Sequence, residues 1–197
     1  MTIDVNVRRF DEAFFENLED IMEDTMVQMF ITHPSDGDDL AAAKEAAAEH
    51  GSIFYSVPLS LHSEADENCV AFSILGEADR ALLPHSGKPL FIDEALLDDA
   101  TIRNLAGSRG VILNATHEYP ALEGFLLAVG PGNVGSFDSE TLGAMNMDRI
   151  VLQSGYPEHG FETIFGAVKV ISDAMFRPEQ SIVARATKSS LELLGFR

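Results

Sequence analysis

The sequence contains no tryptophan and a single cysteine, Cys69. One cysteine cannot form an intramolecular disulfide, and this is typical of proteins from a reducing compartment. Positive charge is also scarce, because 13 lysine and arginine residues stand against 32 aspartate and glutamate residues, a formal net charge of −19. Binding to nucleic acid or to anionic lipid needs cationic side chains. We therefore expect neither nucleic acid nor a membrane surface as a partner, and the charge is typical of a soluble protein.

Long hydrophobic runs are absent as well. No apolar run approaches the roughly 18 residues that a membrane span requires, and residues 1–20 contain no apolar signal-peptide core. These absences predict a cytoplasmic protein. The 197 residues, 46% of them hydrophobic, suffice for a sizeable core. We expect a single domain over residues 1–197, without internal repeats or linkers.

Short β-branched segments alternate with segments of helical periodicity. Strands are expected over residues 2–7, 26–32, 53–61, 69–75, 90–92, 111–114, 126–129 and 149–153. Helices are expected over residues 11–24, 39–50, 93–105, 121–125, 139–145, 161–175 and 179–195. This alternation predicts parallel strands joined by right-handed crossovers. A closed barrel typically has about 250 residues, so a reduced barrel and an open α/β sheet both fit the pattern.

Residues 130–135 (GPGNVG) match the pattern G-x-G-x-x-G. A dinucleotide-binding fingerprint needs a helix that opens inside the motif. Here Pro131 and Phe137 intervene, and the next expected helix begins only near Ser139. We interpret this segment as a turn.

Several polar residues follow predicted strands, where side chains of α/β folds point toward the usual site. Asp93 directly ends a strand, and His62 and His117 each lie just beyond one. No two of the six histidines have i, i+2 or i, i+4 spacing, so a metal centre would need ligands from distant segments. Cys69 opens a predicted strand and is expected in the core rather than as a nucleophile.

Six segments resemble, in chain order, motifs of the TatD-type metal-dependent hydrolases. They are residues 3–8 (IDVNVR, like "IDTHCH"), 59–62 (LSLH, like "VGIHP"), 88–93 (KPLFID, like "KPVVIH"), 110–114 (GVILN, like "GVFHCF"), 147–157 (MDRIVLQSGYP, like "LLLETDAP") and 186–195 (ATKSSLELLG, like "NAKRLFGL"). The resemblance implies a (β/α) barrel with a divalent-metal centre at the carboxyl ends of its strands. It also implies hydrolysis of DNA ends or related phosphoesters. We expect an α/β protein, a reduced TIM-type barrel with about seven or eight short parallel strands.

The resemblance places the family's metal ligands on residues of different chemistry. The corresponding residues are Asn6 and Arg8 for the first-strand histidines, Ile74 or, after a small shift, Glu77 for the bridging glutamate, Asp93 and Asn114 for the later histidines, and Gln153 and Gly155 for the final glutamate and aspartate. An amide oxygen is a poor ligand for a catalytic ion, and the permanent cation Arg8 would repel one. Without the ion there is neither an acidified water nor a Lewis acid.

These replacements predict a TatD-like barrel that has lost catalysis and has no cofactor and no catalytic residue. It would act as a binding or scaffold module for a small molecule or a protein partner. The candidate binding residues are Asn6, Arg8, His62, Asp93, Asn114 and Gln153. We expect Arg8 to take the place of the ion and to pair with Asp93 through a charge-assisted hydrogen bond. Removing Arg8 would then cost more stability than a surface change.

Two other functions also fit the sequence. The first is a metal-dependent hydrolase, phosphodiesterase-like or DNase-like, with a rearranged centre for Mg²⁺ or Mn²⁺. Its ligands would come from His62, Glu77, Asp93 and His117. The second is an unrelated open α/β module. Metal content and turnover of a phosphodiester distinguish the hydrolase from the degenerate barrel.

Overall fold

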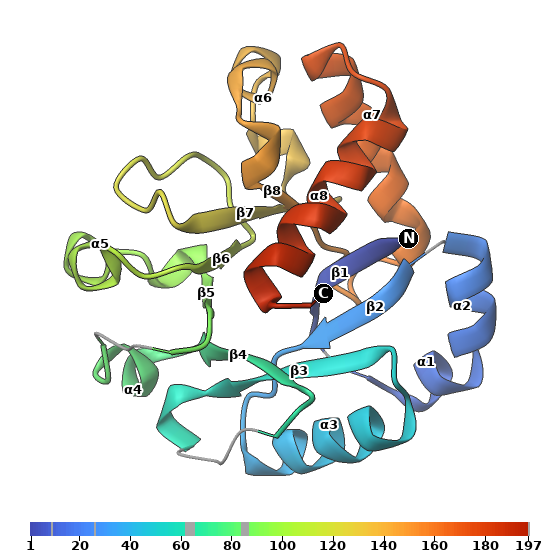
Figure 1. Cartoon of the computed structure of the whole chain (residues 1–197), viewed down its shortest axis with the longest axis vertical. Coiled ribbons are helices and arrows are strands. Elements are labelled where there is room, and N and C mark those ends of the chain that lie inside the picture. The colour runs from blue at the N-terminus through green and yellow to red at the C-terminus, as the bar shows by residue number, and fades with distance from the viewer. Residues whose placement is uncertain (9, 26, 62–65, 84–86, 197) are drawn as a thin grey trace.

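The structure is a computed structural model, and it describes residues 1–8, 10–25, 27–61, 66–83 and 87–196. Eight strands form one sheet in the order of the chain, and each pairs in parallel with the next (Figure 1). They are β1 (Thr2–Val7), β2 (Val27–Thr32), β3 (Ile53–Pro58), β4 (Cys69–Ile74), β5 (Leu90–Asp93), β6 (Gly110–Leu113), β7 (Phe125–Val129) and β8 (Ile150–Leu152). An all-parallel sheet in sequential order is the arrangement of a TIM-type barrel.

The first and last strands meet through the segment that follows β8. Val7 forms a parallel bridge with Tyr156. The Arg8 amide donates to the Tyr156 carbonyl over 2.9 Å, and the Gly155 amide donates to the Asn6 carbonyl over 3.0 Å. The sheet therefore curls into a nearly closed barrel. The expected reduced barrel is confirmed, and the open-sheet alternative is wrong.

The helices are mostly short. They are α1 (Glu12–Glu16), α2 (Leu18–Thr25), α3 (Gly37–Glu49), α4 (Glu77–Arg80), α5 (Asp99–Leu105), α6 (Ser139–Ala144), α7 (Ile164–Met175) and α8 (Glu179–Leu194). Residues 114–124, all of them described, connect β6 to β7 through turns without a helix. Short or missing crossover helices explain how eight strands fit into 197 residues. Of the helices that the structure describes, none has the length and hydropathy to cross a membrane.

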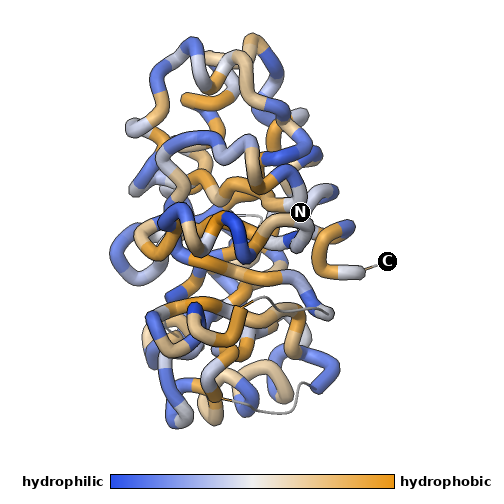
Figure 2. The backbone as a smooth tube through the Cα atoms, turned by 90° about the vertical axis from the view of Figure 1, so that its left-hand side faces the viewer, coloured by the Kyte–Doolittle hydropathy of each residue, from blue (hydrophilic) through white to orange (hydrophobic). Residues whose placement is uncertain are grey.

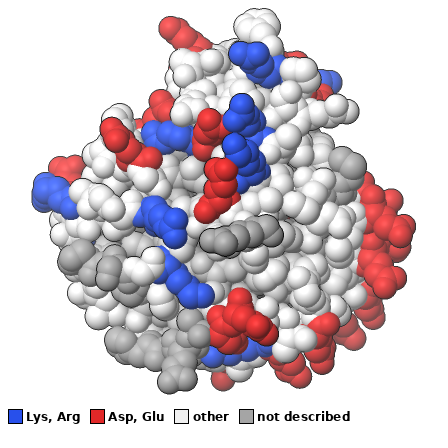
Figure 3. Space-filling model, in the orientation of Figure 1, with Lys and Arg blue, Asp and Glu red and all other residues white. Residues whose placement is uncertain are grey.

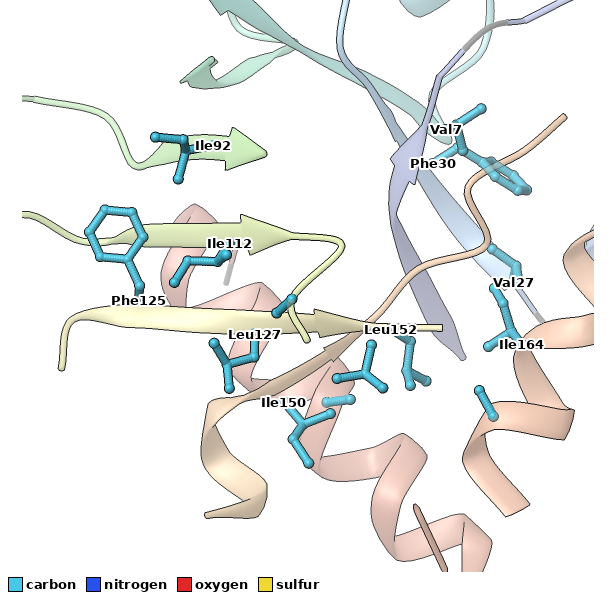
Figure 4. Close-up of a cluster of buried hydrophobic side chains, with 14 of the residues drawn as sticks. Val7, Val27, Phe30, Ile92, Ile112, Phe125, Leu127, Ile150, Leu152 and Ile164 are labelled. Carbon is cyan, nitrogen blue, oxygen red and sulfur yellow. The ribbon is translucent and has the colours of Figure 1, made fainter. Parts of the chain in front are cut away.

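Alternate strand residues divide between two hydrophobic clusters. One cluster contains Ile31, Phe91 and Val151 from strands all around the sheet, so it fills the barrel interior. Leu193, near the end of α8, belongs to the same cluster. The other cluster joins the opposite strand faces to the helices, as in the packing around Ile164 of α7 (Figure 4). Hydrophobic segments accordingly run through the middle of the molecule, and hydrophilic ones lie at its periphery (Figure 2).

Several expected helices differ in the structure because capping side chains and turns interrupt them; residues 161–175, for example, begin with a 3-10 helix, Phe161–Thr163, before α7. Residues 121–125 form turns that lead into β7, not a helix. Residues 93–105 divide into a 3-10 turn, Glu94–Leu96, and α5, because the Asp98 carboxylate accepts from the Thr101 amide and starts a new helix. Residues 11–24 divide at Asn17 into α1 and α2.

Candidate functional site

A pocket of ≈ 430 Å³ lies over the carboxyl ends of β5, β6 and β8, and we call it the mouth pocket. Its lining includes Arg8, Asp93, Asn114, Gln153, Glu158 and His159. Four of the six candidate binding residues are thus among its walls, and Asn6 contacts two of them. The sixth candidate, His62, lies outside the described residues.

The floor of the mouth pocket consists of three side-chain amides that hydrogen-bond to one another. The Nδ2 atom of Asn6 donates to Oε1 of Gln153 over 2.9 Å and to Oδ1 of Asn114 over 3.5 Å. The Nε2 atom of Gln153 donates to the same Asn114 oxygen over 3.1 Å. Asn114 has a backbone φ of 56°, a left-handed conformation that asparagine tolerates better than most residues. Asn6 lies in β1, whereas Asn114 and Gln153 directly follow β6 and β8, so the three residues tie the ends of these strands together.

This hydrogen-bond network extends to Asp93 on one side and to Asn133 on the other. The Nδ2 atom of Asn114 donates to Oδ2 of Asp93 over 2.7 Å, and the Ala95 amide donates to the other carboxylate oxygen over 2.9 Å. On the other side, Nε2 of Gln153 lies 3.4 Å from Oδ1 of Asn133. We call Asn6, Asn114, Asn133 and Gln153 the amide network. Because its members satisfy one another, the floor of the pocket is fixed before any ligand arrives.

Asn133 belongs to the segment 130–135, which forms a turn followed by the 3-10 helix Val134–Ser136. The turn interpretation is therefore confirmed, and α6 begins only at Ser139. A Cβ atom on Gly130 would lie 2.0 Å from the Gln153 carbonyl oxygen, so only glycine allows this approach. Asn133 is not among the residues that the sequence predicts for the site. Its position beyond the end of β7 was the available signal.

The residues of the site do not fit a divalent-metal centre. Within the described part of the chain, no three histidine, cysteine, aspartate or glutamate residues lie together as metal ligands would. Glu77 pairs with Arg80 over 2.8 Å on the surface of α4, and His117 lies 3.3 Å from Glu94 with 62% of its side chain exposed. The structure therefore does not bring Glu77, Asp93 and His117 together as the rearranged centre required.

The predicted pairing of Arg8 with Asp93 is wrong. The Nη1 atom of Arg8 lies 3.2 Å from Oε1 of Glu158, and the two side chains are 50% and 53% exposed. Arg8 follows the last residue of β1, so its side chain reaches the rim of the pocket rather than its floor. Asp93 is instead held by Asn114 and Ala95. The guanidinium therefore does not occupy the place of an ion.

A buried carboxylate that the sequence did not reveal lies beside the site. Asp4 has no solvent exposure and accepts hydrogen bonds over 3.0 Å from the amides of Asn6 and Ser154, as well as from the Ser154 hydroxyl. Burial raises the pKa of Asp4, which the three hydrogen bonds partly oppose. Asp4 thus fastens β1 to the segment after β8. The only sequence feature that pointed to Asp4 was an isolated acidic residue within a β-branched strand.

His33 is also buried beside the barrel interior, just after β2. Its Nε2 atom lies 2.8 Å from the Val5 carbonyl, to which it donates, and Nδ1 accepts from the Ser56 hydroxyl over 2.8 Å. Burial lowers the pKa of His33 to about 4, so the imidazole is neutral at pH 7. Like His62 and His117, His33 follows a predicted strand, and this position could have marked it as a candidate site residue.

The architecture and its pocket at the strand ends define the chain as a TIM-type α/β barrel. No protein-family model and no curated protein sequence matches it. Among solved structures it resembles the TatD homologue YJJV from Escherichia coli K12, with a TM-score of 0.76, 12% identity and coverage of 98% of this chain and 97% of that one. It also resembles a TatD-family hydrolase from Entamoeba histolytica, with a TM-score of 0.68, 10% identity and coverage of 100% and 98%.

An amidohydrolase from Burkholderia multivorans with bound zinc is similar too, with a TM-score of 0.65, 11% identity and coverage of 100% of both chains. At these identities the likeness shows a shared fold. The fold is therefore that of TatD homologues and amidohydrolase barrels.

Proposed function

We propose that this protein is a catalytically degenerate TatD-like barrel that acts as a binding module through its mouth pocket. The observation that carries the proposal is the amide network. Asn6, Asn114 and Gln153 stand where the resemblance expects metal ligands, and their side chains bond to one another instead. A site whose polar atoms are already paired has little left to coordinate an ion, yet it is rigid enough to hold a ligand above it.

The charges around the pocket support the same proposal. Hydrolysis of a phosphoester needs stabilisation of the charge that develops on the phosphoryl oxygens. Arg8 is the one lysine or arginine among the pocket-lining residues that the structure describes, and Glu158 already neutralises it. A phosphate would also approach a chain of net charge −19. Both features disfavour the phosphodiesterase alternative.

The decisive experiment measures metal content and turnover. The purified protein is analysed for bound metals and then assayed against bis-p-nitrophenyl phosphate with Mg²⁺ or Mn²⁺ added. We expect less than one tightly held ion per ten chains and no turnover above the metal-only rate. One ion per chain, with turnover that Asp93→Ala abolishes and the surface change Asp148→Ala leaves intact, would establish the hydrolase and overturn the proposal.

A further inference from the structure

We propose that the mouth pocket takes a small organic cation, an ammonium or guanidinium compound, and that Asp93 supplies its counter-charge. This inference rests on the proposed function, because it takes the mouth pocket as the binding site. It goes further in naming the chemistry of the ligand.

The first argument is the balance of charge on the pocket wall. Two carboxylates, Asp93 and Glu158, and one guanidinium, Arg8, line the pocket beside the imidazole of His159. Arg8 and Glu158 neutralise each other across 3.2 Å. No lysine, arginine or histidine in the described ranges forms an ion pair with Asp93, whose two hydrogen bonds come from neutral amides. Asp93 is therefore the carboxylate of the pocket that has no ion-pair partner.

The second argument is the orientation of Asp93. Each carboxylate oxygen accepts a single hydrogen bond, from Ala95 to Oδ1 and from Asn114 to Oδ2. A carboxylate offers about four lone-pair positions in all, so acceptor capacity remains for a ligand. Asn114 is itself fixed by Gln153 and Asn6, so the carboxylate is held in place before binding. An ammonium or guanidinium group carries donors and no acceptor, which is the complement of this surface.

The third argument excludes the other classes of ligand. A pocket of ≈ 430 Å³ has the size of a small-molecule site. A divalent ion would find there one carboxylate free of an ion pair instead of several ligands. An anion would meet Asp93 and find Arg8 already paired. A neutral compound would leave the charge of Asp93 uncompensated.

Acidic side chains elsewhere on the surface also favour a cationic ligand. The α1 and α2 helices expose Glu12, Glu16, Glu19, Asp20, Glu23 and Asp24. Figure 3 shows acidic side chains along the edge of the molecule where Figure 1 shows the two helices. Such a field raises the local concentration of cations and increases their association rate.

The test uses three compounds of similar size and different charge: n-butylammonium, 1-butanol and butanoate. Binding is followed by isothermal titration and by the NMR shift of the Asn114 amide, which adjoins Asp93. We expect n-butylammonium to bind about tenfold more tightly than 1-butanol and butanoate not to bind, with the affinity for the cation falling as salt rises from 50 to about 500 mM.

The matched variants are Asp93→Asn, which removes the charge with little change of shape, and Asp148→Asn, which removes an exposed carboxylate elsewhere. We expect the first to weaken binding of n-butylammonium about tenfold and the second to leave it unchanged. The wild-type series decides the question even if Asp93→Asn does not fold.

Equal binding of 1-butanol or butanoate at Asn114 would overturn the cation assignment and leave the binding module standing. Failure of n-butylammonium to shift the Asn114 amide would also overturn it. The proposal of a binding module is tested by a different measurement, and it fails if a bound metal and phosphodiester turnover are found. The two failures are therefore distinguishable.

Discussion

The side chains of Asn6 and Gln153 are 147 residues apart in the sequence and 2.9 Å apart in the fold. Both residues are only 2% exposed, so the bond between them is shielded from water. The bond joins the first strand to the residue that follows the last one, at the mouth of the barrel. The bond also sets the orientation of the other amides, because Gln153 can donate to Asn114 only when its oxygen faces Asn6.

We expect Gln153→Glu to lower the free energy of unfolding by about 2 kcal/mol at pH 7. The Nε2 atom of Gln153 donates to Oδ1 of Asn114 and of Asn133, whereas a carboxylate oxygen in its place would face two acceptors. Urea denaturation measures the loss. Gln180→Glu, an exposed glutamine of α8, is the matched control. A Gln153→Glu variant as stable as the control would mean that the amides are oriented differently.

Arg8→Ala is expected to change the free energy of unfolding by less than about 1 kcal/mol. The Arg8–Glu158 pair is half exposed, so water screens most of its attraction. A double-mutant cycle with Glu158→Gln isolates the pair, and we expect a coupling energy below about 0.5 kcal/mol that vanishes in 1 M salt. A loss of about 3 kcal/mol or more would instead restore the buried role that the sequence suggested for Arg8.

The sequence was sufficient for the eight strands because they are short, β-branched segments, and alternation with helices fixed their parallel order. The resemblance to the TatD motifs pointed to Asn6, Asn114 and Gln153, and these residues lie at strand ends that converge on one mouth of the barrel. The ends of the helices were harder to predict from the sequence. A capping carboxylate such as Asp98 divides a periodic segment, and periodicity alone does not show this.

The sequence could not show which residues the individual side chains contact. Whether Arg8 meets Asp93 or Glu158 depends on how far its side chain extends past the end of β1 and on the course of the segment after β8. Asp4 gave no sign of its role because its partner, Ser154, is 150 residues away. Spacing within a strand indicates the face of a residue, but not which distant donor reaches it.

The thiol of Cys69 is expected to be inert in the folded protein. Cys69 is 1% exposed, and burial raises the pKa of its thiol, which disfavours the reactive thiolate. Ellman's reagent should therefore detect less than about one thiol per ten chains in buffer, and one per chain in 6 M guanidinium. Rapid reaction under native conditions would contradict the buried position of the β4 strand at this residue.

Asp4→Ala is expected to lower the free energy of unfolding by about 3 kcal/mol, because the buried amides of Asn6 and Ser154 would lose their acceptor. Asp4→Asn should recover much of this loss, since its side-chain oxygen can still accept. Asp20→Ala, on the exposed face of α2, serves as the control. If Asp4→Ala and Asp20→Ala unfold at the same urea concentration, the carboxylate does not fasten the ends of the barrel.

Acidification should destabilise the fold through His33. The pKa of His33 is about 4 in the folded state against an ordinary value of 6.5, so between these values the unfolded chain binds more protons. The contribution of His33 to stability is therefore complete above pH 6.5 and is lost as the pH falls toward 4. This lowering of the pKa corresponds to about 3 kcal/mol of stability at pH 7.

Urea denaturation from pH 7.5 to 4.5 measures the effect as a difference between variants. In His33→Gln the side-chain nitrogen can still donate to the Val5 carbonyl but cannot titrate, so its stability should fall less with acid than that of the wild type. His117→Gln, which alters an exposed imidazole, should follow the wild type. Parallel curves for the wild type and His33→Gln would show that His33 does not stay neutral inside the barrel.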